Sequence, residues 1–249
     1  MPGLPILTYH SIDDSGSVVS VAPALFARQM AGLAARGWRT LTVSEAVGHL
    51  ERGAVPERHV AITFDDGYRN VFTEAFPVLQ RHGFTATVFL VTDYVGRDNG
   101  WPGHTPPMGV RPLMGWDDAL AMHGEGVELG AHTCTHPDLT RLDPDQAEAE
   151  VARSVAEVEA RTGAPVETFA YPYGAVDGAA LALARRHVRA ACTTRLGRAR
   201  PGDDLHRLGR IDAFYFRRTA LFTDVPGWAL DGYLRARQWV RDVRAPQLS

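Results

Sequence analysis

The stretch of sequence that decides the fold is VAITFDDGY, residues 60–68. Its first five residues are apolar or β-branched, which is typical of a buried strand, and Gly67 then allows the chain to turn. Two carboxylates, Asp65 and Asp66, stand at the carboxyl end of this strand. In parallel α/β barrels the residues that carry chemistry lie where strands end. The stretch therefore predicts a parallel strand and a functional site beside it.

Short runs of the same kind recur along the chain, with helical patterns between them. We predict further strands at residues 6–9, 85–91, 127–131, 168–171 and 190–194. The intervening segments carry apolar residues three to four apart, and the longest predicted helix follows Asp143 and ends at Gly163. Strands that alternate with helices predict an α/β fold with a parallel sheet. At a length of 249 residues, we expect a closed or nearly closed barrel in one domain.

Two stretches interrupt this alternation. Residues 93–115 contain repeated Gly and Pro and are predicted to form a long loop. Residues 228–244 are predicted to form an amphipathic helix, with Leu230, Leu234 and Trp239 on one side and arginines elsewhere. We expect this helix to pack on the barrel; binding to a membrane surface or an acidic partner is the alternative.

Composition and charge narrow the class of protein. Hydrophobic residues make up 45% of the chain, enough for one buried core. We expect a single domain over residues 1–249, with its core at about 4–212 and the C-terminal helix at about 226–244. The 26 Lys and Arg residues against 29 Asp and Glu residues leave a net charge of −3. This balance argues against nucleic-acid binding and fits an uncharged ligand better than a polyanion.

Cysteine content and targeting signals bear on the compartment. Cys134 and Cys192 are too few for a disulfide framework. No run approaches the length of about 18 apolar residues that a membrane span needs, and the first residues lack the features of a secretory signal. We therefore expect no membrane span and a cytoplasmic protein, or a secreted one if a leader precedes residue 1. The sequence does not indicate the oligomeric state.

A second polar motif follows the predicted strand at 127–131. It places His132 and His136 four residues apart on a short turn. Together with Asp66, two imidazoles and one carboxylate make a facial metal site with open positions for water and substrate. Either motif alone is more often an ordinary turn or a pair of incidental histidines. Their joint appearance at strand ends favours a metal site, for which Zn²⁺ is the first candidate and Co²⁺, Ni²⁺ or Fe²⁺ are alternatives.

Charge logic then assigns roles around this metal. Asp65 is left uncoordinated beside it and is predicted to act as general base on a water whose pKa the metal lowers. His10, at the end of the first strand, is predicted to act as general acid, with His206 as the alternative. The backbone N–H in the turn at Tyr173 is a candidate to stabilise an oxyanion.

Aromatic residues in the predicted loops and turns are candidates for stacking on a ring of the substrate. These are Trp101, Tyr171 and Tyr173; the alternative for each is that it only pins a loop. Cys134 lies between the two histidines, but its position in the sequence favours a small packed side chain over a metal ligand.

Three motifs carry a resemblance to a known family. The stretches TFDDGY (63–68), HTCTHP (132–137) and FAYPYG (169–174) resemble the first three motifs of the NodB-homology polysaccharide deacetylases, carbohydrate esterase family 4. The resemblance covers about residues 4–211. It implies a distorted (β/α)₇ TIM-like barrel and a metal-dependent N-deacetylase or related hydrolase. It also implies that Asp65 is the general base and that the metal ligands are Asp66, His132 and His136.

The chain departs from the family pattern in two places. Ala170 stands where many members have an arginine, and no Leu-x-His acid motif follows residue 206. The opening LTYHS (7–11) instead resembles the branch that includes poly-N-acetylglucosamine deacetylases, in which the acid histidine lies on the first strand. This resemblance supports His10 as acid. Arg210 is then a candidate for orienting Asp65, with a structural salt bridge as the alternative.

The leading hypothesis is a hydrolase that removes an acetyl group from an N-acetylated amino sugar, in a polysaccharide, an oligosaccharide or a small glycoside. A second hypothesis is that the same site hydrolyses a C–N bond in a molecule that is not a sugar, as in allantoinase-like and imidase-like relatives. A third is a catalytically silent carbohydrate-binding module that retains a structural metal. Asp65 argues against the third, because binding alone does not require a base.

Overall fold

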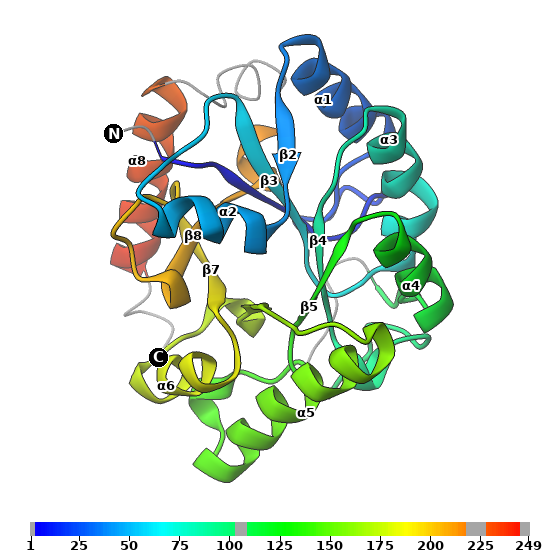
Figure 1. Cartoon of the computed structure of the whole chain (residues 1–249), viewed down its shortest axis with the longest axis vertical. Helices are drawn as coiled ribbons and strands as arrows, with labels where there is room; N and C mark the ends of the chain where they lie inside the picture. The colour runs from blue at the N-terminus through cyan, green and yellow to red at the C-terminus, as the bar shows by residue number, and fades with distance from the viewer. Residues whose placement is uncertain (1–2, 103–108, 218–227, 245–249) are drawn as a thin grey trace.

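A closed barrel of parallel strands forms the body of the molecule. The computed structural model describes residues 3–102, 109–217 and 228–244. β1 (Ile6–Tyr9) pairs with both β8 (Leu208–Asp212) and β3 (His59–Phe64). These two pairings close a ring of seven strands in the order β1-β8-β7-β6-β5-β4-β3 (Figure 1). The expected α/β barrel in one domain is confirmed.

The remaining elements follow the alternation of strands and helices. The other ring strands are β4 (Thr87–Leu90), β5 (Glu128–Ala131), β6 (Thr168–Ala170) and β7 (Ala190–Leu196). The helices are α1 (Pro23–Ala35), α2 (Val43–Glu51), α3 (Phe76–Arg81), α4 (Trp116–Gly124), α5 (Pro144–Thr162), α6 (Gly178–His187) and α8 (Trp228–Arg244). The six predicted strands are all present, with ends shifted by at most a few residues.

The local signals for the longest helix are satisfied as predicted. The Asp143 side chain accepts a hydrogen bond from the Gln146 backbone N–H, and α5 ends at Gly163 with a left-handed φ of 70°. One strand, β2 (Arg39–Leu41), was not predicted. It has only three residues and lies outside the closed ring, beside the first half of β3. So short a run shows no readable periodicity.

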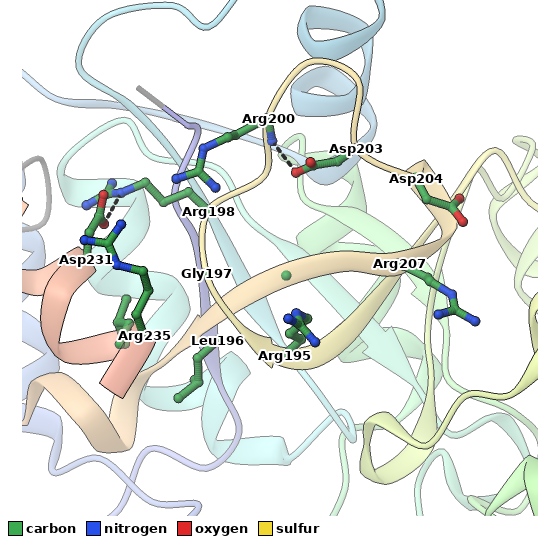
Figure 2. Close-up of a pocket in the computed structure, with 12 residues that line it drawn as sticks. Arg195, Leu196, Gly197, Arg198, Arg200, Asp203, Asp204, Arg207, Asp231 and Arg235 are labelled. Atoms are coloured by element: carbon green, nitrogen blue, oxygen red, sulfur yellow. Dashed lines mark hydrogen bonds and ion pairs between the residues drawn. The ribbon is translucent and has the colours of Figure 1, made fainter. Parts of the chain in front are cut away.

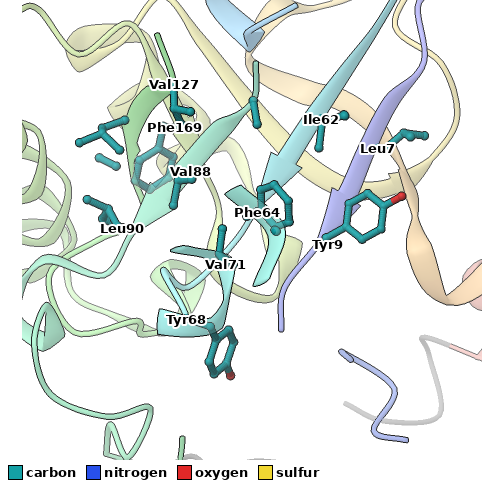
Figure 3. Close-up of a cluster of buried hydrophobic side chains, with 14 of the residues drawn as sticks. Leu7, Tyr9, Ile62, Phe64, Tyr68, Val71, Val88, Leu90, Val127 and Phe169 are labelled. Carbon is teal, nitrogen blue, oxygen red and sulfur yellow. The ribbon is translucent and has the colours of Figure 1, made fainter. Parts of the chain in front are cut away.

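Side chains alternate between the outside and the inside of the barrel. Leu7, Ile62, Val88 and Phe169 belong to the core between the strands and the surrounding helices (Figure 3). Their neighbours in the same strands form a second apolar cluster, which includes Ile6, Ala61, Phe89, Ala170 and Leu208. Because successive residues of a strand point to opposite faces, this second cluster fills the barrel interior.

The amino end of the barrel interior is closed by α2. Val43, Ala46, Val47 and Leu50 of this helix belong to the interior cluster. Further along the same strands the inward positions become polar, at Thr63, Asp65 and Arg210, all of them buried. The apolar seal at one end thus leaves the opposite, carboxyl end for charged groups.

The predicted loop at 93–115 contains no α-helix or ladder strand in its described residues. It has a 3₁₀ turn at Thr92–Tyr94 and isolated bridges from Tyr68 to Leu113 and from Asp98 to Pro112. Residues 103–108 lie outside the described part. The bridge to Tyr68 ties this loop to the turn that follows β3.

The C-terminal helix α8 packs on β7. The Gln238 side chain accepts a hydrogen bond from the Leu196 N–H at 2.8 Å, and Arg241 donates to the Thr194 carbonyl at 2.9 Å. Leu230 and Leu234 are buried, but Trp239 is 68% exposed, so its expected place on the buried side is wrong. At about 100° per residue, Trp239 lies half a turn around the helix from Leu230. Among the described residues, we find no helix with the length and apolar character of a membrane span.

Candidate metal and catalytic site

The candidate site lies at the carboxyl ends of β1, β3 and β5, where the backbone adopts left-handed conformations. Asp66, Thr133, His136 and Tyr173 have φ values of 71°, 65°, 59° and 60°. In the described part of the chain, Arg58 is the one other non-glycine residue with positive φ. Each such residue costs about 1–3 kcal/mol in the general case, and such strain collects at functional sites.

The three predicted metal ligands meet in space. The Asp66 Oδ1 atom lies 3.4 Å from His132 Nε2 and 3.3 Å from His136 Nε2. The three ligand atoms lie within 4.8 Å of one another, and all three side chains are buried. Within the described residues this is the one His, Cys, Asp and Glu cluster of that kind.

The hydrogen bonds around His132 fit a metal ligand. Its Nδ1 atom lies 2.7 Å from the carbonyl oxygen of Ala170. A carbonyl accepts but cannot donate, so we assign the proton to Nδ1, which leaves the Nε2 lone pair facing Asp66. One carboxylate oxygen and two imidazole nitrogens are a donor set that Zn²⁺ and similar divalent cations take. The residues therefore fit a divalent cation.

Glu150 of α5 holds the turn that carries the two histidines. Its carboxylate accepts hydrogen bonds from the backbone N–H groups of Cys134 (2.8 Å) and Thr135 (2.9 Å) and from the Thr135 hydroxyl (2.7 Å). The Cys134 thiol donates to the Glu150 carbonyl, and burial raises the pKa of Cys134 to about 11. Cys134 is therefore a packed thiol, as expected. The part played by Glu150 was not predicted.

Asp65 turns away from the three ligands and pairs with Arg210. The Arg210 guanidinium donates to both carboxylate oxygens, each at 2.7 Å, and both side chains are buried. Arg210 is fixed in turn by bonds to the Thr193 carbonyl (3.0 Å) and the Thr63 hydroxyl (3.1 Å). Burial raises the pKa of Asp65, but the charge and hydrogen bonds of Arg210, with His10, hold it below its usual value. Asp65 is thus an oriented, ionised carboxylate.

His10 lies between Asp65 and solvent. Its Nε2 atom is 3.8 Å from Asp65 Oδ2, and its side chain is 19% exposed. The backbone that follows is tied down by Asn70, whose amide donates to the Ser11 hydroxyl (2.6 Å) and accepts from the Ile12 N–H (3.0 Å). Asn70 thus joins the segment after β1 to the turn after β3. This contact was not predicted.

Tyr68 links the ligand Asp66 to the loop at 93–115. Its hydroxyl accepts a hydrogen bond from Asn99 at 3.1 Å, and Asn99 accepts from the Arg111 N–H at 2.7 Å. Burial and, to a smaller extent, the negative charge of Asp66 raise the pKa of Tyr68, so the phenol stays neutral. The loop is therefore anchored directly behind a predicted ligand.

The three predicted aromatic residues occupy different positions. Trp101 is buried with its ring centroid 4.4 Å from that of His136, so it supports the ligand from behind. The Tyr173 ring lies 4.7 Å from His136 and is 50% exposed, so it offers a surface beside the cluster. Tyr171 does not join them: it is buried and its hydroxyl donates to the His206 carbonyl at 3.1 Å.

The alternative acid, His206, lies far from the cluster along its strand. It stands in the 3₁₀ turn Leu205–Arg207 that precedes β8, at the amino end of that strand. Its Nε2 atom lies 2.9 Å from the Val188 carbonyl. Since the candidate site is at the carboxyl ends of the strands, His206 does not reach it, and His10 is the histidine beside Asp65.

Comparison with known proteins points to one family. Residues 52–190 match the family model described as polysaccharide deacetylase. The chain is 32% identical over 210 residues to the putative polysaccharide deacetylase YxkH of Bacillus subtilis, covering 84% of this chain and 70% of the relative.

Two further relatives add detail. The poly-beta-1,6-N-acetyl-D-glucosamine N-deacetylase of Staphylococcus epidermidis is 38% identical over 80 residues, which cover 32% of this chain and 28% of that protein. The structure of IcaB from Ammonifex degensii matches with a TM-score of 0.76 and 27% identity, covering 92% of this chain and 97% of that one. With the family model matched over more than half of its length, this chain belongs to the polysaccharide deacetylase family of hydrolases.

Proposed function

We propose that this protein removes the acetyl group from the nitrogen of an N-acetylated amino sugar in a glycan. The observation that carries the proposal is the different environment of two adjacent carboxylates. Asp66 faces two histidines, whereas Asp65 is held on both oxygens by Arg210. Hydrolysis by an activated water requires a bound metal and a nearby carboxylate that can accept the proton of the water. A metal ligand next to an oriented carboxylate that does not bind the metal meets this requirement.

The metal part of the proposal assigns Asp66, His132 and His136 to one divalent cation, with Zn²⁺ as the first choice. When bound, such a cation supplies Lewis-acid chemistry, because it lowers the pKa of water and polarises a carbonyl oxygen. Buried ligands and the Ala170 carbonyl behind His132 keep this donor set in place.

The remaining steps belong to residues of the chain itself. Asp65 orients the attacking water and accepts its proton, and Arg210 keeps Asp65 ionised and correctly directed. His10 supplies the proton that the departing amine needs; its distance of 3.8 Å from Asp65 supports this role. The exposed Tyr173 ring beside His136 is a surface for the sugar, and its backbone N–H is assigned to the oxyanion.

The test measures acetate release from N-acetyl sugars and, separately, ring opening of a non-sugar amide, with metal added back. The panel contains poly-N-acetylglucosamine, oligomers of N-acetylglucosamine, a small N-acetyl glycoside and the non-sugar amide allantoin. We expect acetate from at least one N-acetyl sugar, its loss in Asp65→Asn, and full activity in the matched control Asp145→Asn, an exposed carboxylate of α5. Hydrolysis of allantoin alone, or sugar binding without acetate release, would contradict the proposal.

A further inference from the structure

Two neighbouring cavities lie along the outer side of β7, apart from the candidate metal site. The larger, about 650 Å³, lies between the β7–β8 connection and the first turns of α8 (Figure 2). The smaller, about 380 Å³, lies between β7, Gly174 and the second half of α8. Both are lined by Arg195 and Arg207, so they lie side by side, and we refer to the two together as the groove.

The groove exists because one connection of the barrel lacks a helix. Every other pair of consecutive strands is joined through an α-helix. Between β7 and β8, all of whose connecting residues are described, the chain forms only the 3₁₀ turn Leu205–Arg207. The outer face of β7 is therefore covered only in part, by α8.

The larger cavity is lined by more cations than anions. Figure 2 shows arginines from the end of β7, from the β7–β8 connection and from α8. The lining arginines are Arg195, Arg198, Arg200, Arg207 and Arg235, against Asp203, Asp204 and Asp231. On formal charge, the lining thus carries an excess of two positive charges, although the chain as a whole is negative.

The three aspartates are already engaged. Asp231 pairs with Arg198 at 2.6 Å, and Asp204 pairs at 2.8 Å with Arg185, which lies outside the lining. Asp203 accepts a hydrogen bond from the Arg200 backbone N–H at 2.7 Å. Two of the three aspartates are thus paired with arginines, and Asp203 keeps its negative charge.

Four guanidinium groups consequently face the groove without an anionic partner. Within the described residues, no hydrogen bond or ion pair involves the side chains of Arg195, Arg200, Arg207 or Arg235. Elsewhere among the described residues, arginines are paired, as Arg161 is with Glu157, or lie exposed on separate helices without an ion pair, as Arg28 and Arg81 do, whereas these four line one hollow. Like charges gathered in one hollow repel one another, and an arginine fork binds carboxylate and phosphate groups through paired hydrogen bonds.

We propose that this groove binds the carboxylate or phosphate groups of an anionic sugar unit. A volume of about 650 Å³ is suitable for a ligand the size of a sugar unit. The smaller cavity reaches Gly174, the residue after Tyr173, whose ring lies beside His136. The groove therefore leads toward the candidate site and assigns an anionic glycan as substrate, an extension that rests on the proposed function. The near-neutral net charge had favoured an uncharged ligand.

The experiment measures binding directly, so that it does not depend on turnover. The full chain is titrated by calorimetry with glucose 6-phosphate, glucuronate, inorganic phosphate and neutral glucose, at low and at physiological salt. The test variant combines Arg195→Gln, Arg207→Gln and Arg235→Gln. The matched control removes three exposed arginines elsewhere, Arg28→Gln, Arg36→Gln and Arg81→Gln.

We expect at least one anionic sugar to bind saturably and about tenfold or more tightly than glucose. The test variant should lose tenfold or more of this affinity, while the control stays within about twofold. Inorganic phosphate distinguishes the anion from the sugar part, because equal affinity for free phosphate would overturn a sugar-specific groove. Equal losses in test and control variants, or no preference over glucose, would also overturn the proposal.

Binding of the anionic sugar can be interpreted even if the proposed deacetylase function is wrong. The same titration in an Asp65→Asn background should show unchanged affinity for the anionic sugar, because Asp65 does not line either cavity. In the parent protein, binding of the anionic sugar without acetate release from any N-acetyl sugar would count against the catalytic proposal alone. Retained acetate release without binding counts against the groove alone.

Discussion

The two ends of the barrel interior are built from the same strands but follow opposite rules. At the amino end, inward side chains such as Ile6, Phe89 and Leu208 pack against α2 and bury apolar surface. At the carboxyl end, the inward positions hold Asp65 and Arg210, both buried and charged. Burial of apolar side chains at the amino end stabilises the folded state. Burial of charged side chains at the carboxyl end costs desolvation free energy, which is consistent with a role in function and not in stability.

Backbone conformation shows the same contrast. Asp66, His136 and Tyr173 near the carboxyl end have positive φ, whereas no residue of the strands does so in the described chain. A well-packed amino end is what lets the barrel tolerate this strain. Variants at the two ends should therefore separate stability from activity.

The largest effect is expected from Asp65→Asn at the carboxyl end. The amide cannot accept the proton, so turnover should fall about 10³-fold or more, as for the loss of a general base combined with lost orientation. Metal content, measured by elemental analysis, should stay unchanged because Asp65 is not a ligand in this account. A rate within tenfold of the parent enzyme would remove Asp65 from the mechanism.

At the amino end, Leu50→Ala should give the opposite pattern. Leu50 is buried where α2 seals the barrel, and truncation of a buried leucine generally costs about 2–5 kcal/mol of unfolding free energy. Turnover per folded molecule should stay within about twofold. The matched control Val18→Ala removes an exposed apolar side chain and should change stability little. If Leu50→Ala lost activity without losing stability, the amino end would not be responsible for stability alone, in contradiction to the expected difference between the two ends.

A smaller effect is expected from Glu150→Gln behind the metal ligands. The amide oxygen can still accept both backbone N–H bonds, which share one oxygen of Glu150, but the variant loses the charge that strengthens all three hydrogen bonds. Metal affinity should fall about 10- to 100-fold, as is typical when a group that positions a ligand is lost. Glu148→Gln, on the same helix but paired with Arg186, is the control and should leave metal affinity unchanged. Equal metal affinities in the two variants would dismiss Glu150 as a positioning residue.

The smallest effect is expected from Asn70→Ala, which releases the segment after His10. Without the bonds to Ser11 and Ile12, His10 loses its fixed position relative to Asp65. We expect kcat to fall about tenfold, with KM and metal content unchanged. Thr73→Ala, at an exposed position of the neighbouring π-helical segment Val71–Ala75, serves as control. A change in KM instead of kcat would place Asn70 in substrate binding.

Strand ends made much of the site predictable from the sequence. Asp65, Asp66 and His132 directly follow or end apolar runs, so the parallel topology alone brings them together. Arg210 was predicted to orient Asp65, with a structural salt bridge as the alternative, and in the structure it donates to both oxygens of Asp65.

Other features depend on contacts that no local pattern encodes. Asn70 and Ser11 are 59 positions apart, and Glu150 reaches its partners from a separate helix. Tyr171 is different, because strand alternation places it on the outside: Ala170 points inward and Phe169 outward. That signal was available in the sequence and excludes Tyr171 from the site.

In the proposed mechanism, deacetylation requires a divalent cation bound by Asp66, His132 and His136. This requirement is tested most directly by stripping the full chain with a chelator, titrating Zn²⁺ back and measuring bound metal and acetate release together. We expect acetate release to rise in step with bound metal and to saturate at about one ion per chain. In the His132→Ala and His136→Ala variants, added Zn²⁺ should restore neither bound metal nor acetate release. Full acetate release from the stripped protein, or full metal stoichiometry in either variant, would contradict it.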